Sequence, residues 1–160
     1  MIYENPNSQF VIMIRSIQWK KPNTLKKPQS FYTKQIIKSA KYGSLNQKVS
    51  EALLSLPYPQ GKSYSILQGC NTNFTHKYEY NLFSLDFKMN EGEEVAAVFE
   101  GIIIAVVDEY TIGGRNKSLE DYGNYIMIYH EELGTYSTYY HLKPQGSLVK
   151  IGDNVKQNQV

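Results

Sequence analysis

The stretch from Asn73 to Phe87, NFTHKYEYNLFSLDF, sets the framework on which the rest of the chain is interpreted. Apolar and polar residues alternate from Leu82 to Met89, which is the period of a β-strand. One face of this strand is expected to pack in the core, so Asp86 points to the other face. His76 lies ten residues earlier, in the preceding loop. A carboxylate and an imidazole brought together in this way predict a metal site.

Each of the two side chains also has a simpler interpretation. His76 could be an ordinary loop histidine. Asp86 is the stronger candidate, because aspartate is depleted in strands and is costly to bury without a partner. The single cysteine, Cys70, could in principle pair with His76 as a thiol nucleophile, but an incidental or buried cysteine is the favoured interpretation.

Composition excludes several classes of protein. The chain has 160 residues, 41% hydrophobic and 20% charged, which fits one globular domain with an extension. A net charge of +2 gives no indication of a nucleic-acid partner or of an anionic membrane surface. The longest early apolar run, Phe10–Ile14, is too short for a membrane span or a signal-peptide core, so neither is predicted.

Residues 1–55 differ in character from the remainder and form an N-terminal extension of uncertain structure. Residues 9–17 have the pattern of a strand, and residues 31–42 have apolar spacing typical of a helix. Residues 44–54 fit either a second short helix, because Ser44 and Gln47 resemble a capping box, or extended structure. The lysines between residues 20 and 41 are interpreted as a solvated basic face rather than a polyanion site.

Residues 56–160 predict an all-β domain. Strands are expected at 63–68 and 82–89, and residues 95–107 are expected to form two strands that meet at a bend, where Gly101 allows a positive φ. Residues 124–130 and 135–142 predict a hairpin. The long polar loop at 108–123 is typical of a lid or groove wall, and residues 149–160 predict a strand, a turn and the start of another strand.

The chain carries a series of short motifs in a recognisable order. They are Leu56-Pro-Tyr-Pro-Gln-Gly, Gln68-Gly, Phe74-Thr-His, Leu85-Asp-Phe, Gly92, Gly101, Asn124-Tyr-Ile-Met-Ile-Tyr-His, Gly134-Thr-Tyr, Tyr140-His-Leu and Val149-Lys-Ile-Gly-Asp-Asn-Val. Together they resemble the lysostaphin-type zinc metallopeptidases, which include many bacterial peptidoglycan endopeptidases. The resemblance covers roughly residues 56–160. It implies a mainly β fold, an antiparallel and barrel-like sheet, with zinc bound in a groove.

The resemblance also implies roles for individual residues. His76 and Asp86 match the positions of two zinc ligands, although their spacing of ten residues corresponds to a subgroup with a longer loop. His141 matches a catalytic histidine beside the metal, whereas His130 matches a histidine that is not a ligand. The family completes its site with a His-x-His pair, and this sequence reaches Val160 before such a motif. We therefore expect a peptidase domain that is incomplete at its C-terminal side.

Two functions are consistent with this sequence. The first is a zinc endopeptidase that cleaves peptide cross-links of bacterial peptidoglycan, with Zn²⁺ as cofactor and a peptide or peptidoglycan substrate. The alternative is a degenerate, non-catalytic peptidase fold that acts as a binding or regulatory module of the cell envelope. The resemblance implies a location in the cell envelope or outside the cell. The sequence gives no indication of an oligomeric state.

Overall fold

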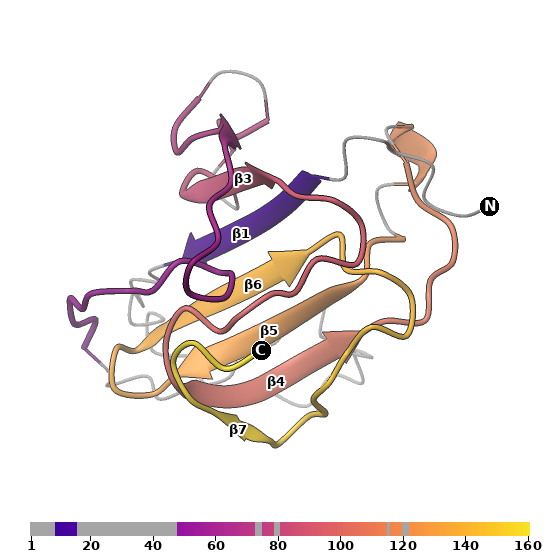
Figure 1. The fold of residues 1–160 in the computed structure, drawn as a ribbon. Helices are drawn as coiled ribbons and strands as arrows, with labels where there is room; N and C mark the ends of the chain where they lie inside the picture. The colour runs from indigo at the N-terminus through magenta and orange to yellow at the C-terminus, as the bar shows by residue number, and fades with distance from the viewer. Residues whose placement is uncertain (1–8, 16–47, 73–74, 79–80, 115, 120–121) are drawn as a thin grey trace, which may run out of the picture.

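A computed structural model of the chain describes residues 9–15, 48–72, 75–78, 81–114, 116–119 and 122–160. These residues form a seven-stranded sheet, antiparallel throughout, in the order β2-β3-β1-β6-β5-β4-β7 (Figure 1). The elements are β1 (Gln9–Arg15), β2 (Ile66–Gln68), β3 (Ser84–Lys88), β4 (Gly101–Val107), a 3-10 turn (Lys117–Leu119), β5 (Tyr125–His130), β6 (Thr135–Tyr140) and β7 (Asn154–Val155). The predicted mainly β, antiparallel fold is confirmed. Within the described residues the sheet is open, and no closed barrel is found.

Strand β1 connects the two halves of the sheet. It pairs with β3 on one side and with β6 on the other, so that Val11 is opposite both Asp86 and Tyr140. The strand pattern predicted near residue 9 is thus present, and it lies in the middle of the sheet rather than apart from it (Figure 1). The division of the chain at residue 55 stays a prediction.

The helices expected in the N-terminal part have two different outcomes. The helix at 31–42 lies outside the described residues. In the described part of 44–54, residues 48–54 form neither a helix nor a strand, so the predicted short helix is absent there. Ser50 N donates to Leu133 O at 3.0 Å, and Ser55 N donates to Val98 O at 2.9 Å. These bonds, to the β5–β6 turn and to the irregular segment before β4, replace bonds that a helix would have supplied.

The hairpin of β5 and β6 was predicted correctly and forms the centre of the sheet. Its register pairs Ile128 with Ser137 and Ile126 with Tyr139. Side chains from this face build the core with neighbouring strands, where Phe87 and Ile103 are each 1% exposed. The opposite face carries two tyrosine ring pairs whose centroids lie 5.3 and 5.1 Å apart, Tyr125–Tyr140 and Tyr129–Tyr136.

The apolar run at 95–107 forms one strand and not two. Strand β4 begins at Gly101, whereas residues 95–100 are irregular because their backbone bonds go to loops: Ala96 N donates to Pro57 O and Ala97 N to Gln159 O. The predicted role of Gly101 was also wrong, since its φ is not positive. Glycine is required there because a Cβ would overlap the carbonyl oxygen of Tyr129. No helix among the described residues has the length and apolarity needed to cross a bilayer.

Candidate metal centre

Asp86 is a buried carboxylate in the middle of β3. The residue is 5% exposed, and the alternation of the strand places its side chain on the face opposite Phe87. The prediction that Asp86 points away from the core face therefore holds, but the side chain is covered rather than open to water. Removal from water raises the pKa of Asp86, and the nearby His76 partly offsets this effect.

His76 is the residue that covers Asp86. Its ring is 2% exposed, and Nε2 lies 3.0 Å from Oδ1 of Asp86. The other ring nitrogen, Nδ1, lies 2.9 Å from the carbonyl oxygen of Gly69. Since a carbonyl oxygen can only accept, Nδ1 must carry the proton and donate. In the neutral ring, Nε2 then presents a lone pair toward the Asp86 carboxylate.

This arrangement suits a cation between the two side chains. Oδ1 of Asp86 is buried and has no aligned hydrogen-bond partner among the described residues, although His76 Nε2 is only 3.0 Å away. Two acceptors facing one another in this way are unfavourable unless a proton or a metal lies between them. Zinc binds histidine nitrogen and carboxylate oxygen at about 2.0–2.2 Å, which at a tetrahedral angle separates the two ligand atoms by roughly 3.3–3.6 Å, so Nε2 and Oδ1 would have to move slightly apart to admit the ion. A carbonyl that fixes the distal ring nitrogen is also typical of metal-ligating histidines.

A second buried oxygen without a partner lies on the same face of β3. Ser84 is two residues before Asp86 and fully buried, and its Oγ has no hydrogen-bond partner among the described residues. A group bound beside Asp86 would give this hydroxyl something to bind. Within the described ranges there is no cluster of three or more His, Cys, Asp or Glu side chains that could hold a metal ion. Among the described residues the candidate centre is thus a pair of possible ligands, His76 and Asp86.

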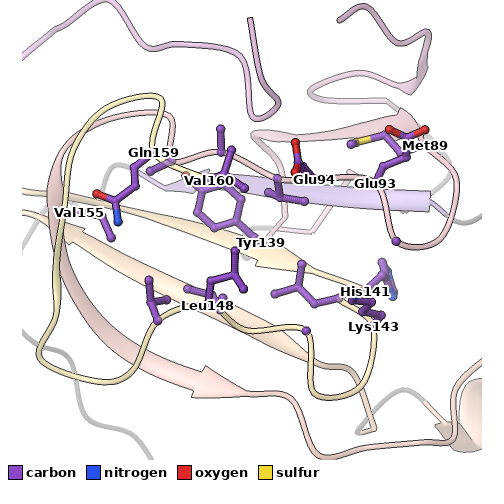
Figure 2. A pocket seen from close by; sticks show the side chains of 18 of the residues that line it. Met89, Glu93, Glu94, Tyr139, His141, Lys143, Leu148, Val155, Gln159 and Val160 are labelled. Carbon is purple, nitrogen blue, oxygen red and sulfur yellow. The ribbon is translucent and has the colours of Figure 1, made fainter.

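His141 lies directly after β6, at the edge of a cavity of about 360 Å³ (Figure 2). Tyr139 and Leu142 also line this cavity, whereas neither His76 nor Asp86 is among its described lining residues. His141 has a left-handed backbone, with φ at 63°, an uncommon conformation for a residue other than glycine. Desolvation by the surrounding protein lowers the pKa of its imidazole. The side chain is nevertheless exposed, so we expect water to weaken that shift.

The backbone around His141 is held by a buried amide. Asn124 is 1% exposed, and its Nδ2 donates to Leu142 O at 3.2 Å and to Tyr110 O at 2.9 Å. Leu142 N donates in return to Asn124 O at 3.2 Å. Asn124 therefore ties the residue after His141 to the start of the 108–123 loop. In the sequence Asn124 had been assigned only as the beginning of a strand, and no local pattern distinguishes it.

A comparison with protein-family models matches residues 82–160 to peptidase family M23. This part of the chain belongs to the M23 family. The predicted resemblance to the lysostaphin-type peptidases is thereby confirmed. Peptidases of the M23 family are generally metal-dependent. No curated protein and no solved structure matches the chain. Asp86 and His141 lie inside the M23 segment, and His76 lies shortly before it.

The other histidine of the M23 segment, His130, belongs to a buried hydrogen-bond chain. Its Nδ1 donates to Glu100 O at 2.7 Å, and its Nε2 lies 2.9 Å from Ser137 Oγ. Ser137 Oγ lies 3.1 Å from the hydroxyl of Tyr139, which accepts from Val98 N at 2.8 Å. A neutral His130 lets every hydroxyl in this chain donate once, because Ser137 donates to Nε2 and Tyr139 donates to Ser137. His130 therefore acts as part of the interior.

Removing the hydroxyl of Tyr139 tests this chain. In Tyr139→Phe, Val98 N–H loses its acceptor and Ser137 loses a partner inside the core. We expect the free energy of unfolding to fall by about 1–3 kcal/mol, the usual cost of an unsatisfied buried group. Urea denaturation measures it. Tyr64→Phe is the control, because its hydroxyl binds Glu93 near the surface at 2.6 Å, and a loss there as large as in Tyr139→Phe would contradict the assignment.

The same chain predicts a dependence of stability on pH. Burial lowers the pKa of His130 below its ordinary 6.5, so below that pH the unfolded chain binds a proton that the folded protein does not. The contribution of His130 to the free energy of unfolding is therefore fully present above pH 6.5. It decreases as the pH falls toward the pKa of His130 in the folded protein, by up to about 1.4 kcal/mol per pH unit. Urea denaturation at several pH values measures this slope. In His130→Asn, which keeps a donor toward Glu100, the slope should decrease, and an unchanged slope would assign it to other groups.

Proposed function

We propose that the M23 segment, together with His76, is a zinc endopeptidase that cleaves peptide cross-links of bacterial peptidoglycan, in the cell envelope or outside the cell. The observation that carries this proposal is the buried His76–Asp86 pair, whose acceptor atoms face each other 3.0 Å apart in a segment of a peptidase family. A peptide substrate follows from the family. The zinc ion and peptidoglycan are our own inference.

The residues have separate tasks in this proposal. His76 would hold the metal through Nε2 and Asp86 through Oδ1, while Gly69 keeps the proton on Nδ1 of His76. When bound, zinc supplies a water with a pKa near 7 and polarises the carbonyl of the scissile peptide. His141 would exchange a proton with the reacting groups, since an imidazole that is neutral at pH 7 can accept one.

The direct test is hydrolysis of purified peptidoglycan. We expect the purified protein to release soluble fragments with new amino termini, and a metal chelator to abolish this release. Asp86→Asn and His141→Ala should both lose it, whereas Asp108→Asn, which removes a carboxylate outside the pair, should keep it. Hydrolysis that survives both the chelator and Asp86→Asn would rule out the zinc proposal.

One observation favours the alternative, a non-catalytic binding or regulatory module. The described residues bring together two ligands, whereas catalytic zinc usually has three from the protein. This alternative predicts that the purified protein carries no stoichiometric zinc and that His141→Ala leaves its biological effect unchanged. A loss of that effect in His141→Ala would count against it.

A further inference from the structure

The residue opposite Asp86 in the sheet is placed there by a β-bulge. Ile66 pairs with Phe87, but the next pair is Gln68 with Asp86, so that two residues of β2 correspond to one step of β3. A regular ladder would have put Leu67 opposite Asp86. Bulges of this kind redirect a side chain and are common beside functional sites. Here the bulge places Gln68, rather than Leu67, opposite Asp86.

The side chain of Gln68 binds the segment that carries His76. The carboxamide orientation that satisfies its neighbours places Oε1 2.9 Å from His76 N and 3.1 Å from Thr75 N. In this orientation Oε1 also lies 3.2 Å from the hydroxyl of Thr72, and Nε2 faces Thr75 Oγ1 at 3.1 Å. One oxygen therefore accepts from two successive backbone N–H groups in a segment that has no regular ladder of its own.

The next residue completes the hold on His76. Gly69 O accepts from Nδ1 of the His76 ring at 2.9 Å, so Gln68 fixes the backbone of His76 while Gly69 fixes its ring. Both contacts come from the end of β2, the strand that pairs with the Asp86 strand. We propose that Gln68 is a positioning residue, which holds Nε2 of His76 against Asp86 so that a divalent cation can be bound between them. This inference rests on the metal role proposed above.

Without Gln68, His76 would have to be ordered by the metal itself. Two backbone N–H groups would lose their acceptor, and the 75–78 segment would be tied to β2 mainly through the ring of His76. Ordering the segment would then reduce the free energy available for binding. Groups that orient a metal ligand typically contribute 10- to 100-fold in affinity, and we expect a loss of about 10-fold here.

Two substitutions of Gln68, both of similar length, test whether its hydrogen-bond acceptor matters rather than its shape. Gln68→Met keeps the length but has no strong acceptor, whereas Gln68→Glu keeps the oxygen that faces His76 N and Thr75 N. The matched control is Gln157→Met, because Gln157 is also half-buried and donates to two backbone carbonyls, those of Leu53 and Val98, away from the pair. Melting temperatures of all variants report any general loss of stability.

Two measurements are made on each variant. The first is zinc affinity, by competition with a chromophoric chelator. The second is the ¹⁵N NMR signature of the His76 ring in metal-free protein, which reports whether the proton stays on Nδ1. We expect Gln68→Met to bind zinc about 10-fold more weakly and to show mixed tautomers. Gln68→Glu and Gln157→Met should retain the Nδ1–H tautomer and at least the affinity of the wild type.

The two readouts distinguish this inference from the proposed function. If the wild type binds zinc and Gln68→Met matches it in both affinity and tautomer, Gln68 is not a positioning residue and the metal function stands. If neither the wild type nor any variant binds zinc, the zinc proposal fails. If Gln68→Met is then the one variant that loses the Nδ1–H tautomer, the positioning of His76 by Gln68 is still supported. A loss in Gln157→Met equal to that in Gln68→Met would overturn the inference by assigning the effect to general stability.

Discussion

Replacing Asp86 with asparagine is expected to remove most of the metal affinity of this protein. Asparagine keeps the size of the side chain, but it replaces a negative oxygen with an amide that binds zinc poorly. Because Asp86 is one of the two ligands proposed in the described part of the chain, its loss would leave His76 alone. We expect zinc affinity to fall by about 100-fold or more, beyond the range seen for groups that only orient a ligand.

Zinc titration of the purified protein, with metal content measured by mass spectrometry, gives the result directly. Asp153→Asn is a suitable control, because Asp153 caps a turn through Lys150 N and lies directly before β7, away from the pair. Unchanged zinc affinity in Asp86→Asn would show that the metal binds elsewhere. The melting temperature of the metal-free variant should not fall, since the substitution removes a buried charge that is unfavourable when no cation is present.

The second large effect is expected at Gly101. In Gly101→Ala the new methyl group would overlap the carbonyl oxygen of Tyr129 and approach Ile128 Cγ2 to 2.8 Å. Neither neighbour can move freely, because Tyr129 is paired across β4 and β5 and Ile128 is 3% exposed in the core. Overpacking of this kind costs about 1–3 kcal/mol, and a clash with backbone is expected at or above the upper end.

Urea denaturation again provides the measurement, and Gly123→Ala provides the control. Gly123 also lacks a positive φ, and a Cβ there would meet its nearest neighbour, Tyr140 Cδ1, at an ordinary 3.8 Å. We expect Gly123→Ala to change the free energy of unfolding by less than about 0.5 kcal/mol, as most substitutions without a clash do. Equal effects at the two positions would mean that the close approach of β4 and β5 at Gly101 can relax.

The local part of this structure could be predicted from the sequence. The alternation around Asp86 predicted β3 and the side on which the carboxylate lies, and the pattern of residues 124–142 predicted the β5–β6 hairpin. Both depend on neighbours in the sequence, which periodicity reports well. The pairing of His76 with Asp86 was proposed for the same reason, because the two residues are only ten positions apart.

The remaining features depend on contacts between distant segments. No pattern near residue 9 indicates that β1 lies between β3 and β6. Gly101 was noted in the sequence, but the reason that glycine is needed there is the nearby carbonyl oxygen of Tyr129, a residue far along the chain. Gln68 was assigned only as the end of the 63–68 strand and as part of a Gln-Gly motif. Its contacts with His76 depend on a bulge that the sequence of β2 does not indicate.

The central position of β1 has a consequence for the order in which this sheet can assemble. Among the described strands, β3 is joined to the β6–β5–β4 side only through β1, although about 70 residues separate the end of β1 from the start of β3. The hairpin of β5 and β6 can form from local sequence, whereas the junction at β1 requires closure of a long loop. We therefore expect the two proposed ligands, His76 and Asp86, to meet on a small β2–β3 unit that joins the rest of the sheet late in folding. The candidate metal centre would then lie beside the strand pairing at β1, which forms last.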